Sequence, residues 1–378
     1  MRLELGLPGI KILIDSREFI LGRFTGIARV LDGLIDALSE YASTEVIFSA
    51  TYSADCIPAR LRCRSRIRIN KIPNSFLSAE RFLSDFSKKT DIFISPYPKL
   101  PLFGVHCRAI HIIHDVLDLT HPLYRKRFKA VFDRFRLKKA LRRADITWYD
   151  SSWSMVETQK HFGGCGRNPR VRYPGISEAF HPNEQQDEHT ILAKYRLTAG
   201  YILALGNGMP HKNLGVILEI FAKIKRPLVF AGVSDENQRY WKSNYPRTHP
   251  LWLRQVDEHH LPALLRGAFC LVQPSLVEGY GYPPLEAMAC GTPVVVNCIP
   301  VLKETTGGNA ISVDSQNSRA WAEALIALED SFLYQDRVEK GLKWVEPLRG
   351  RKAWEKHIFD IGELIKKCGD EEGSERSE

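Results

Sequence analysis

Two glutamates, Glu278 and Glu286, stand at the two ends of the short segment EGYGYPPLE. A carboxylate accepts two hydrogen bonds, so each of them suits the vicinal diol of a ribose or of a sugar ring. Between them, Gly279 and Gly281 let the backbone approach an anion closely. A phosphate or diphosphate with a diol on each side is a nucleotide sugar. The segment therefore predicts a site for a molecule of this kind.

The elements around this segment decide where its side chains lie. AFCLVQPS (268–275) is predicted to be a buried strand, and PPLEAMACG (283–291) a helix with proline at its start and Gly291 at its end. The two glycines therefore lie in a loop that leaves a parallel strand and enters a helix. Ligands of open α/β sheets bind there, and a helix N-terminus favours an anion. Two simpler interpretations stay open: Glu286 only complements the helix dipole, and Glu278 is a solvated loop residue.

Strands and helices alternate in two successive series along the 378 residues. The first series runs from a strand at 9–15 and includes RLRCRSRIRIN (60–70), whose alternating arginines predict one basic strand face. A polar segment at about 182–199 is the expected linker, and a second series begins at GYILALGN (200–207). The pattern predicts an α/β protein with two Rossmann-like, doubly wound parallel-sheet domains, at 1–180 and 190–350. The charged end, 369–378, is predicted to be a disordered tail.

Positive charge is concentrated in the first half of the chain. Residues 1–180 hold 30 Lys and Arg against 18 Asp and Glu, a net charge of +12, whereas the whole chain carries +9. This basic half is expected to face an anionic partner, or else to carry charge for solubility alone. A basic helix is predicted at 124–143, and its cations could attract anionic lipid headgroups. Its stripe of apolar residues is interpreted as core: Phe128, Val131, Phe132 and Phe135.

Composition disfavours several other classes of protein. No apolar run reaches the roughly 20 residues that a membrane-spanning helix needs. The N-terminal residues show no apolar run of the signal-peptide type, so none is expected. The eight cysteines form no C-x-x-C pair. That spacing argues against a zinc site and fits reduced thiols in a cytosol.

Several segments, in their order along the chain, resemble one known family. EGYGYPPLEAMACGTPVVV resembles the E-x7-E signature of the retaining glycosyltransferases of family 4, which have the GT-B fold. TGIARV resembles the family's N-terminal glycine loop, IIHDVLDLTHP its "HD" segment, and YILALGNGMPHKNL its first C-domain strand and phosphate loop. DSSWSMVETQKHFG, QVDEHHLPALLRGAFCLVQPSLVEGYG and RKAWEKH resemble further segments. The resemblance covers nearly the whole chain.

The resemblance implies a role for each matching residue. Glu286 would bind the ribose hydroxyls, Glu278 would hold the transferred sugar, and Lys212 would neutralise the diphosphate. His114 would lie near the transferred sugar, and Asp115 would orient its segment. The implied donor pocket also contains Gly26, Asn207, Val256, Gly279, Tyr280, Gly281, Tyr282 and Leu285.

Further expectations follow from the same resemblance. Gly26 would let the first-domain loop close on the donor, and Val256 would lie against the nucleobase. A C-terminal helix at about 351–367 would cross back to the first domain. The two domains would face each other across a cleft that closes when the donor binds.

One departure from the family pattern concerns the charge of the pocket. Many members carry an arginine where this chain has Asn207, and Arg23 and Arg29 are candidates to compensate for it. No D-x-D motif occurs in the sequence, so the manganese-dependent scheme of other glycosyltransferases lacks its usual ligand motif. The expectation is an enzyme with no metal and no cofactor.

The resemblance to bacterial mannosyl- and rhamnosyltransferases implies a retaining, metal-independent hexosyltransferase. The expected donor is a GDP-sugar such as GDP-mannose, and the expected acceptor is a lipid-linked or polysaccharide glycan of the O-antigen or lipopolysaccharide type. The expected location is cytoplasmic, peripheral on the inner face of the cytoplasmic membrane, without nucleic acid as a partner. The alternatives are a UDP- or dTDP-sugar-dependent transferase and a catalytically silent nucleotide-sugar-binding partner protein. The +12 half also suggests a nucleic-acid-binding module, but no signature of one accompanies it.

Overall fold

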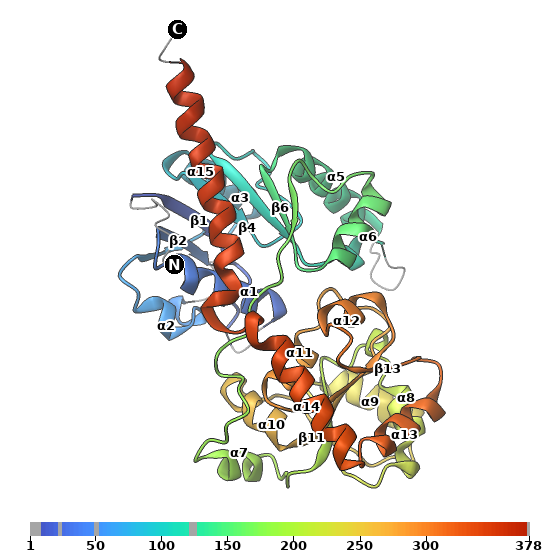
Figure 1. Ribbon diagram of the computed structural model, residues 1–378. Coiled ribbons are helices and arrows are strands. Elements are labelled where there is room, and N and C mark those ends of the chain that lie inside the picture. Colours follow the sequence, from blue (N-terminus) through green and yellow to red (C-terminus); the bar gives the residue numbers. More distant parts are fainter. Residues whose placement is uncertain (1–8, 22–24, 49–52, 121–126, 376–378) are drawn as a thin grey trace. The chain divides into compact units, whose positions relative to one another are not determined.

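The computed structural model describes residues 9–21, 25–48, 53–120 and 127–375. The chain divides into two compact units, of which the first contains Met1–Gly175 together with Gly350–Glu378 and the second contains Ile176–Arg349. Figure 1 shows the helices and strands of both units, coloured along the chain. Each unit is described by itself. The expected domain boundary lay between residues 180 and 190, a few residues beyond the division between Gly175 and Ile176.

The first unit is built on a seven-stranded sheet whose neighbouring strands are all parallel, in the order β3-β2-β1-β4-β5-β6-β7. The strands are β1 (Lys11–Asp15), β2 (Ser43–Phe48), β3 (Ile67–Lys71), β4 (Ile92–Ser95), β5 (Arg108–Ile113), β6 (Ile146–Tyr149) and β7 (Pro169–Val171). Its helices are α1 (Gly26–Leu38), α2 (Ala59–Arg62), α3 (Phe76–Phe86), α4 (Leu117–Thr120), α5 (Arg127–Arg143), α6 (Ser152–Phe162) and α15 (Glu355–Glu375).

The second unit is built on a six-stranded sheet, again with parallel neighbours, in the order β10-β9-β8-β11-β12-β13. The strands are β8 (Tyr201–Leu205), β9 (Leu228–Ala231), β10 (Leu251–Leu253), β11 (Ala268–Gln273), β12 (Val294–Asn297) and β13 (Ile311–Val313). Its helices are α7 (Glu188–Lys194), α8 (Gly215–Glu219), α9 (Asp235–Asn244), α10 (Leu261–Gly267), α11 (Tyr282–Ala289), α12 (Pro300–Thr305), α13 (Ser318–Ala327) and α14 (Ser331–Val345).

Both sheets have the doubly wound arrangement predicted from the sequence. In each, the first strand of the unit lies in the middle and the order runs outward from it in two directions. The direction changes between β1 and β4 in the first unit and between β8 and β11 in the second. Loops that follow the two central strands separate there and leave a crevice in which such sheets bind ligands.

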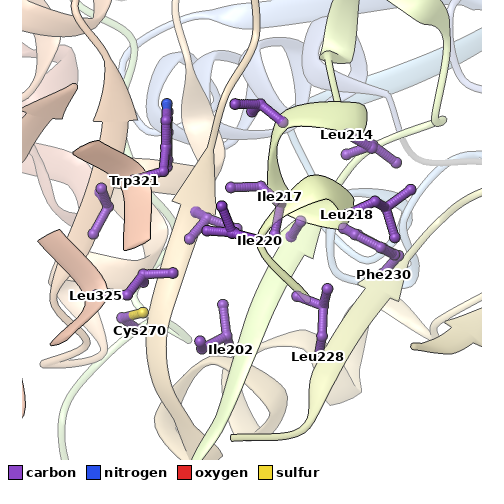
Figure 2. Packing of buried hydrophobic residues seen from close by; sticks show 14 of the residues in the cluster. Ile202, Leu214, Ile217, Leu218, Ile220, Leu228, Phe230, Cys270, Trp321 and Leu325 are labelled. Atoms are coloured by element: carbon purple, nitrogen blue, oxygen red, sulfur yellow. The ribbon is translucent and has the colours of Figure 1, made fainter. Parts of the chain in front are cut away.

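Apolar side chains from both sheet and helices make the core of the second unit. Figure 2 shows Leu218 of α8 beside Phe230 of β9, and Cys270 of β11 beside Leu325 of α13. All four are buried, between 0% and 5% exposed. A core filled to this extent fixes the strand ends, and therefore the loops that leave them.

The C-terminal helix α15 is anchored on the first unit through one buried carboxylate. Asp360 is fully buried and accepts a hydrogen bond of 2.8 Å from the indole nitrogen of Trp148 in β6. The guanidinium groups of Arg170 and Arg172 both pair with it. Helix α15 therefore belongs to the unit that holds the N-terminal strands (Figure 1), as the family resemblance implied for residues 351–367.

The predicted basic strand at residues 60–70 is partly wrong. Its first part forms the short helix α2, and only Ile67–Lys71 forms a strand. The reason is the spacing of the cations, because Arg60 and Arg64 reach Asp32 and Asp36 on the neighbouring helix α1. These arginines therefore point toward α1 and do not form one face of a strand.

Two further predictions about chain ends and connections are wrong. The expected linker at 182–199 contains helix α7 of the second unit, held by a buried pair between Glu188 and Arg266. The tail expected to be disordered continues helix α15 as far as Glu375, and residues 376–378 lie outside the described residues. Extending an existing helix needs no new nucleation, so a charged sequence without apolar periodicity can still continue it.

The interpretation of the stripe on the basic helix as core is also wrong where it can be checked. Val131, Phe132 and Phe135 of α5 are 69%, 42% and 61% exposed, whereas the side chain of Phe128 lies outside the described residues. The side of α5 that faces the core carries smaller residues such as Ala130. Among the helices that the structure describes, none combines the length and the apolar character needed to span a bilayer.

Candidate functional site

Two loops meet at the point where the strand order of the second sheet reverses. One follows β8 and runs through Asn207 and Lys212, and the other follows β11 and runs through Glu278. They are joined directly, because the backbone N–H of Leu276 donates to the carbonyl oxygen of His211 over 2.8 Å. Both loops leave the carboxyl ends of adjacent parallel strands, which is where ligands of doubly wound sheets bind.

An ion pair between these loops forms the centre of the site. The Lys212 ammonium lies 2.6 Å from the Glu278 carboxylate, and their side chains are only 17% and 12% exposed. Gln273, the last residue of β11, donates its side-chain amide to the same carboxylate oxygen. The hypothesis that Glu278 is a solvated loop residue is therefore wrong. One cation and one carboxylate therefore lie together between the two loops, largely shielded from solvent.

The charge state of Glu278 follows from its surroundings. Burial by itself raises the pKa of Glu278, but the Lys212 ammonium opposes this through its charge and its hydrogen bond. Hydrogen bonds with Ser275 and Gln273 act in the same direction, and the net result is a pKa below the ordinary value. Glu278 is therefore an anion at neutral pH and can accept hydrogen bonds from hydroxyl groups.

Gly206 begins the loop that carries Lys212. Its backbone has φ +144, and a Cβ at this residue would lie 3.4 Å from the Lys212 side chain. Its N–H donates to the carbonyl of Ala231 in β9 over 3.0 Å, which fixes the start of the loop. The lysine stem would tolerate a Cβ at this distance, so it is the positive φ that favours glycine at this position of the predicted phosphate loop.

Helix α11 begins where the second loop ends. Gly281 caps it in the left-handed conformation, with φ +90, and a Cβ there would lie 2.6 Å from Leu302. Pro283 and Pro284 have no N–H groups, so Tyr282 and Leu285 supply the backbone donors of the first turn. The helix start can still hold an anion, with fewer donors than an ordinary N-terminus provides.

The remaining predicted donor-binding residues of this segment are mostly buried. Glu286 lies on α11 and is 1% exposed, which is more burial than a residue that only complements a helix dipole requires. The rings of Tyr280 and Tyr282 pack edge to face with centroids 5.1 Å apart, and Leu285 is fully buried. Val256 is half-buried in the segment that follows β10.

Asn207 is exposed and binds its own loop. Its side-chain oxygen accepts the N–H of Met209 over 3.1 Å, and its carbonyl accepts a hydrogen bond of 2.7 Å from Asn237. It places no positive charge at the position where the family pattern has an arginine. Of the two arginines considered as substitutes, Arg29 is half-buried on α1 and Arg23 lies outside the described residues.

Sequence reasoning missed a network of amides that holds the loops together. Asn297, buried at the end of β12, donates to the carbonyl of Ser275 over 2.9 Å and accepts the N–H of Ser315 over 3.0 Å. Asn213 in turn donates to the carbonyl of Ser315 over 3.3 Å. The sequence did contain a signal for this network, namely a polar residue at the end of an otherwise buried strand. Gln273 ends β11 and Asn297 ends β12 in this way.

His114 of the first unit is held on both ring nitrogens. Nδ1 lies 2.6 Å from the carboxylate of Asp150, and Nε2 lies 3.0 Å from the carbonyl oxygen of Pro96. Both partners can only accept, so the ring carries both protons. Burial by itself lowers the pKa of His114, but Asp150 and, to a lesser extent, Asp115 raise it above the ordinary value. His114 therefore connects the loops that follow β4, β5 and β6 as a cation.

The other two predicted residues of the first unit have structural contacts. Gly26 is the first residue of α1 and is exposed, directly after the capping residue Thr25, whose hydroxyl donates to Glu18 over 2.8 Å. Asp115 accepts the backbone N–H of Leu117 over 2.9 Å at the start of α4. The catalytic and donor-binding roles that the resemblance implies for Gly26, His114 and Asp115 stay predictions.

The His114 contacts predict a pH-dependent contribution to stability. A histidine whose folded pKa is raised stabilises the fold fully below its unfolded pKa of about 6.5, and this is lost as the pH rises through the folded pKa. The difference in melting temperature between wild type and His114→Gln should therefore shrink as the pH rises above about 6.5. His189→Gln, at a side chain that is 95% exposed, is the control and should show no such trend. A difference that grows with pH would contradict the assignment.

Two parallel sheets of the same order, the second with a charged loop site where its order reverses, define a protein of the GT-B fold. The structure of Anabaena HepE in complex with UDP-glucose matches this chain with a TM-score of 0.74, covering 93% of this chain and 99% of that one at 14% identity. At that identity the likeness supports the fold alone.

Residues 188–344, which contain Lys212, Glu278 and Glu286, match the family model of the group 1 glycosyl transferases. This part of the chain is therefore a glycosyl transferase group 1 domain, and the predicted family resemblance is confirmed at the level of this domain.

Two curated relatives are similar in sequence over part of their length. The O-antigen chain mannosyltransferase B of Escherichia coli is 28% identical over 247 residues, which are 62% of this chain and 65% of that protein. The O-antigen chain mannosyltransferase RfbU of Salmonella typhimurium is 25% identical over 223 residues, 57% of this chain and 60% of that protein. The chain thus spans less than two thirds of the length of each of these relatives.

Proposed function

We propose that this protein is a retaining glycosyltransferase that moves a hexose from a nucleotide sugar to a glycan of the bacterial cell surface. The observation that carries the proposal is the pair of Lys212 and Glu278, 2.6 Å apart in the crevice where the second sheet reverses its order. A cation for a diphosphate and an anionic acceptor for sugar hydroxyls are the two functions that a nucleotide-sugar site needs together.

The chemistry of the reaction fits the charges of the site. Breaking the bond between sugar and diphosphate builds negative charge on the leaving oxygen. Lys212 and the first turn of α11 are fixed positive ends that stabilise this charge, and preorganised electrostatics of this kind is often the largest catalytic contribution. The acceptor hydroxyl attacks the sugar face that the diphosphate leaves, which retains the configuration, and the leaving phosphate takes the proton. No step in this scheme calls on a metal ion or another cofactor.

The roles of the two glutamates follow from their positions. Glu278, at the end of the β11 loop, accepts hydrogen bonds from the hydroxyls of the transferred sugar. Glu286, one turn into α11 and 1% exposed, accepts those of the ribose. Val256, in the segment after β10, is the proposed neighbour of the nucleobase.

For the donor we propose a GDP-sugar, with mannose or a 6-deoxymannose as the transferred sugar. The support is that two relatives are named as O-antigen chain mannosyltransferases. A UDP-sugar is the second candidate, because the similarly folded HepE is described in complex with UDP-glucose. The proposed acceptor is a lipid-linked or polysaccharide glycan, and the proposed location is cytoplasmic, on the inner face of the cytoplasmic membrane.

The donor proposal is tested by measuring melting temperatures with GDP-, UDP-, ADP- and dTDP-sugars for the wild type and for Glu286→Ala. We expect GDP-mannose to raise the melting temperature of the wild type by several degrees, since a ligand at about 100 times its dissociation constant adds about 2.7 kcal/mol. Glu286→Ala should lose most of this shift for every donor. Stabilisation by a UDP-sugar and not by a GDP-sugar would overturn the choice of base.

A catalytically silent binding protein is the alternative that Asn207 favours, because the pocket lacks the arginine of the family pattern. Measuring donor hydrolysis and sugar transfer on the same samples separates the two functions. Donor hydrolysis or sugar transfer by the wild type supports the proposal that the protein is an enzyme. A donor-dependent thermal shift without turnover, at any acceptor tested, supports the binding protein.

A further inference from the structure

One face of helix α5 is exposed and combines apolar and basic side chains. In its first half Val131, Phe132 and Phe135 are 69%, 42% and 61% exposed. In its second half this face carries four exposed cations at the same helical spacing, namely Lys138, Lys139, Arg142 and Arg143. Exposed large apolar residues gathered on one face mark an interaction surface.

The charge on this face is of one sign. Asp133 is the acidic residue among the described side chains of α5, at residues 130–143. It stands two residues from both Val131 and Phe135, on a different side of the helix. Within the part of the chain that the structure describes, none of the four cations forms an ion pair with a carboxylate. Lys139 and Arg143 instead donate to the carbonyls of Leu102 and Val105.

Arg136 lies at the edge of this face, 5.8 Å from the centre of the Phe132 ring, and fixes α5 to the first unit. Arg136 and Glu80 of α3 form an ion pair of 2.7 Å with side chains only 4% and 1% exposed. Arg136 also donates to the carbonyl of Leu100 over 2.7 Å. These contacts fix how α5 is rotated against the first unit, and therefore which of its side chains are exposed.

The apolar surface continues onto the loop beside the helix. Phe103 is 45% exposed, and the guanidinium of Arg81 from α3 lies 5.1 Å from the centre of its ring. Lys139 of α5 donates to the carbonyl of Leu102, which is the residue before Phe103. Phe103 therefore lies next to the α5 face. Here too an aromatic ring and a cation are exposed together.

We propose that this face of α5, together with Phe103, is the surface by which the protein lies on an anionic lipid bilayer. The aromatic and valine side chains enter the region between headgroups and acyl chains, and the four cations contact lipid phosphates. Lysine and arginine can do both at once, because their apolar stems lie along acyl chains while their charged ends stay among the phosphates. The inference rests on the proposed membrane location and adds the residues that would contact the membrane. It does not depend on the proposed reaction.

The composition of the face favours lipid over the other anionic partners. A nucleic acid would use the cations and could stack on the phenylalanines, but it gains nothing from Val131, which has no aromatic ring and is the most exposed of the three. A protein partner would need an acidic surface with an apolar centre. An anionic bilayer supplies phosphate and hydrocarbon side by side over the whole area.

The proposal is tested by co-sedimentation with vesicles of phosphatidylcholine alone and of phosphatidylcholine mixed with phosphatidylglycerol, without donor or acceptor. We expect the full chain to bind the anionic vesicles and to release them at high salt. Lys138→Gln/Arg142→Gln should weaken binding about 30-fold, since each charge contributes about fivefold. Phe132→Ser/Phe135→Ser should weaken it at least about tenfold.

Matched controls remove the same groups from the second unit. Lys223→Gln/Lys225→Gln removes two exposed cations there, and Phe332→Ser removes a phenylalanine that is 83% exposed. Both should bind vesicles like the wild type. Equal binding of the wild type and the α5 variants to anionic vesicles would overturn the proposal, and so would equal binding of the wild type to neutral and anionic vesicles. A wild type that is a dimer in solution, and that becomes a monomer in the α5 variants, would show that a second copy of the chain covers this face instead.

A second measurement does not rely on loss of binding. Phe135→Trp places a fluorophore on the face, and lipids brominated on their acyl chains should quench its emission beyond that of the wild-type tryptophans. Absence of this extra quenching in vesicle-bound protein would reject insertion. Donor-induced thermal shifts on the same variants should stay as in the wild type, so a failure of the membrane surface is distinguishable from a failure of the proposed transferase.

Discussion

Lys212→Ala is expected to lower kcat for sugar transfer by about two to three orders of magnitude, as the loss of one preorganised electrostatic group does in other enzymes. Lys212 is the cation that lies in the crevice of the second sheet, 2.6 Å from Glu278. Without it, the negative charge that develops on the leaving diphosphate meets only the weaker dipoles of the backbone and the α11 start. The measurement is steady-state turnover of a nucleotide sugar at saturating donor.

The same change should also destabilise the protein, which provides an internal control. Glu278 is only 12% exposed and would lose its counterion, and removing one partner of a buried pair costs about 3–5 kcal/mol. Lys212→Ala/Glu278→Gln should therefore recover most of the lost stability but none of the turnover. Lys223→Ala, which removes an exposed lysine of the same unit, should change neither. Undiminished turnover in Lys212→Ala would show that the diphosphate is held elsewhere.

Asp360→Ala is expected to destabilise the protein strongly. Its carboxylate is fully buried, pairs with Arg170 and Arg172, and accepts the indole N–H of Trp148. Alanine would leave two guanidinium groups, 18% and 20% exposed, without their shared counterion, and breaking a buried pair in this way costs about 3–5 kcal/mol. The measurement is the midpoint of urea unfolding.

A matched substitution separates burial from charge in this prediction. Asp336 pairs with Lys340 over 2.7 Å, but the two side chains are 29% and 54% exposed. Asp336→Ala should therefore change stability by no more than about 0.5 kcal/mol. If the two variants lose similar stability, the cluster around Asp360 does not hold α15 on the first unit.

Much of the fold could be predicted because its strands are short, buried and bounded by loop residues. The segments GIKILID, GYILALGN and TPVVVN predict strands that the structure places at Lys11–Asp15, Tyr201–Leu205 and Val294–Asn297. The glycine and proline signals around PPLEAMACG likewise predict helix α11. Patterns of this kind are local, and the alternation of strand and helix then limits the topology to doubly wound sheets.

The rest depends on contacts that no local pattern contains. Lys212 and Glu278 are 66 residues apart in the chain, and only the sheet order brings their loops together. Helix α5 carries two apolar stripes, and the sequence favoured the larger side chains as core. The structure buries the side with Ala130, Leu137 and Ala140 instead, and Arg136 pairs with Glu80 on α3. The size of the apolar residues alone does not reveal which stripe faces the core.

The return of α15 to the first unit has a consequence for biosynthesis. Residues 176–349 leave the ribosome before Asp360 does, so the second unit can complete its sheet during translation. The first unit then still lacks the carboxylate that Trp148, Arg170 and Arg172 share. The part of the protein that is made first is therefore finished last. Translation that stalls before residue 360 would release a folded second unit beside an incomplete first one.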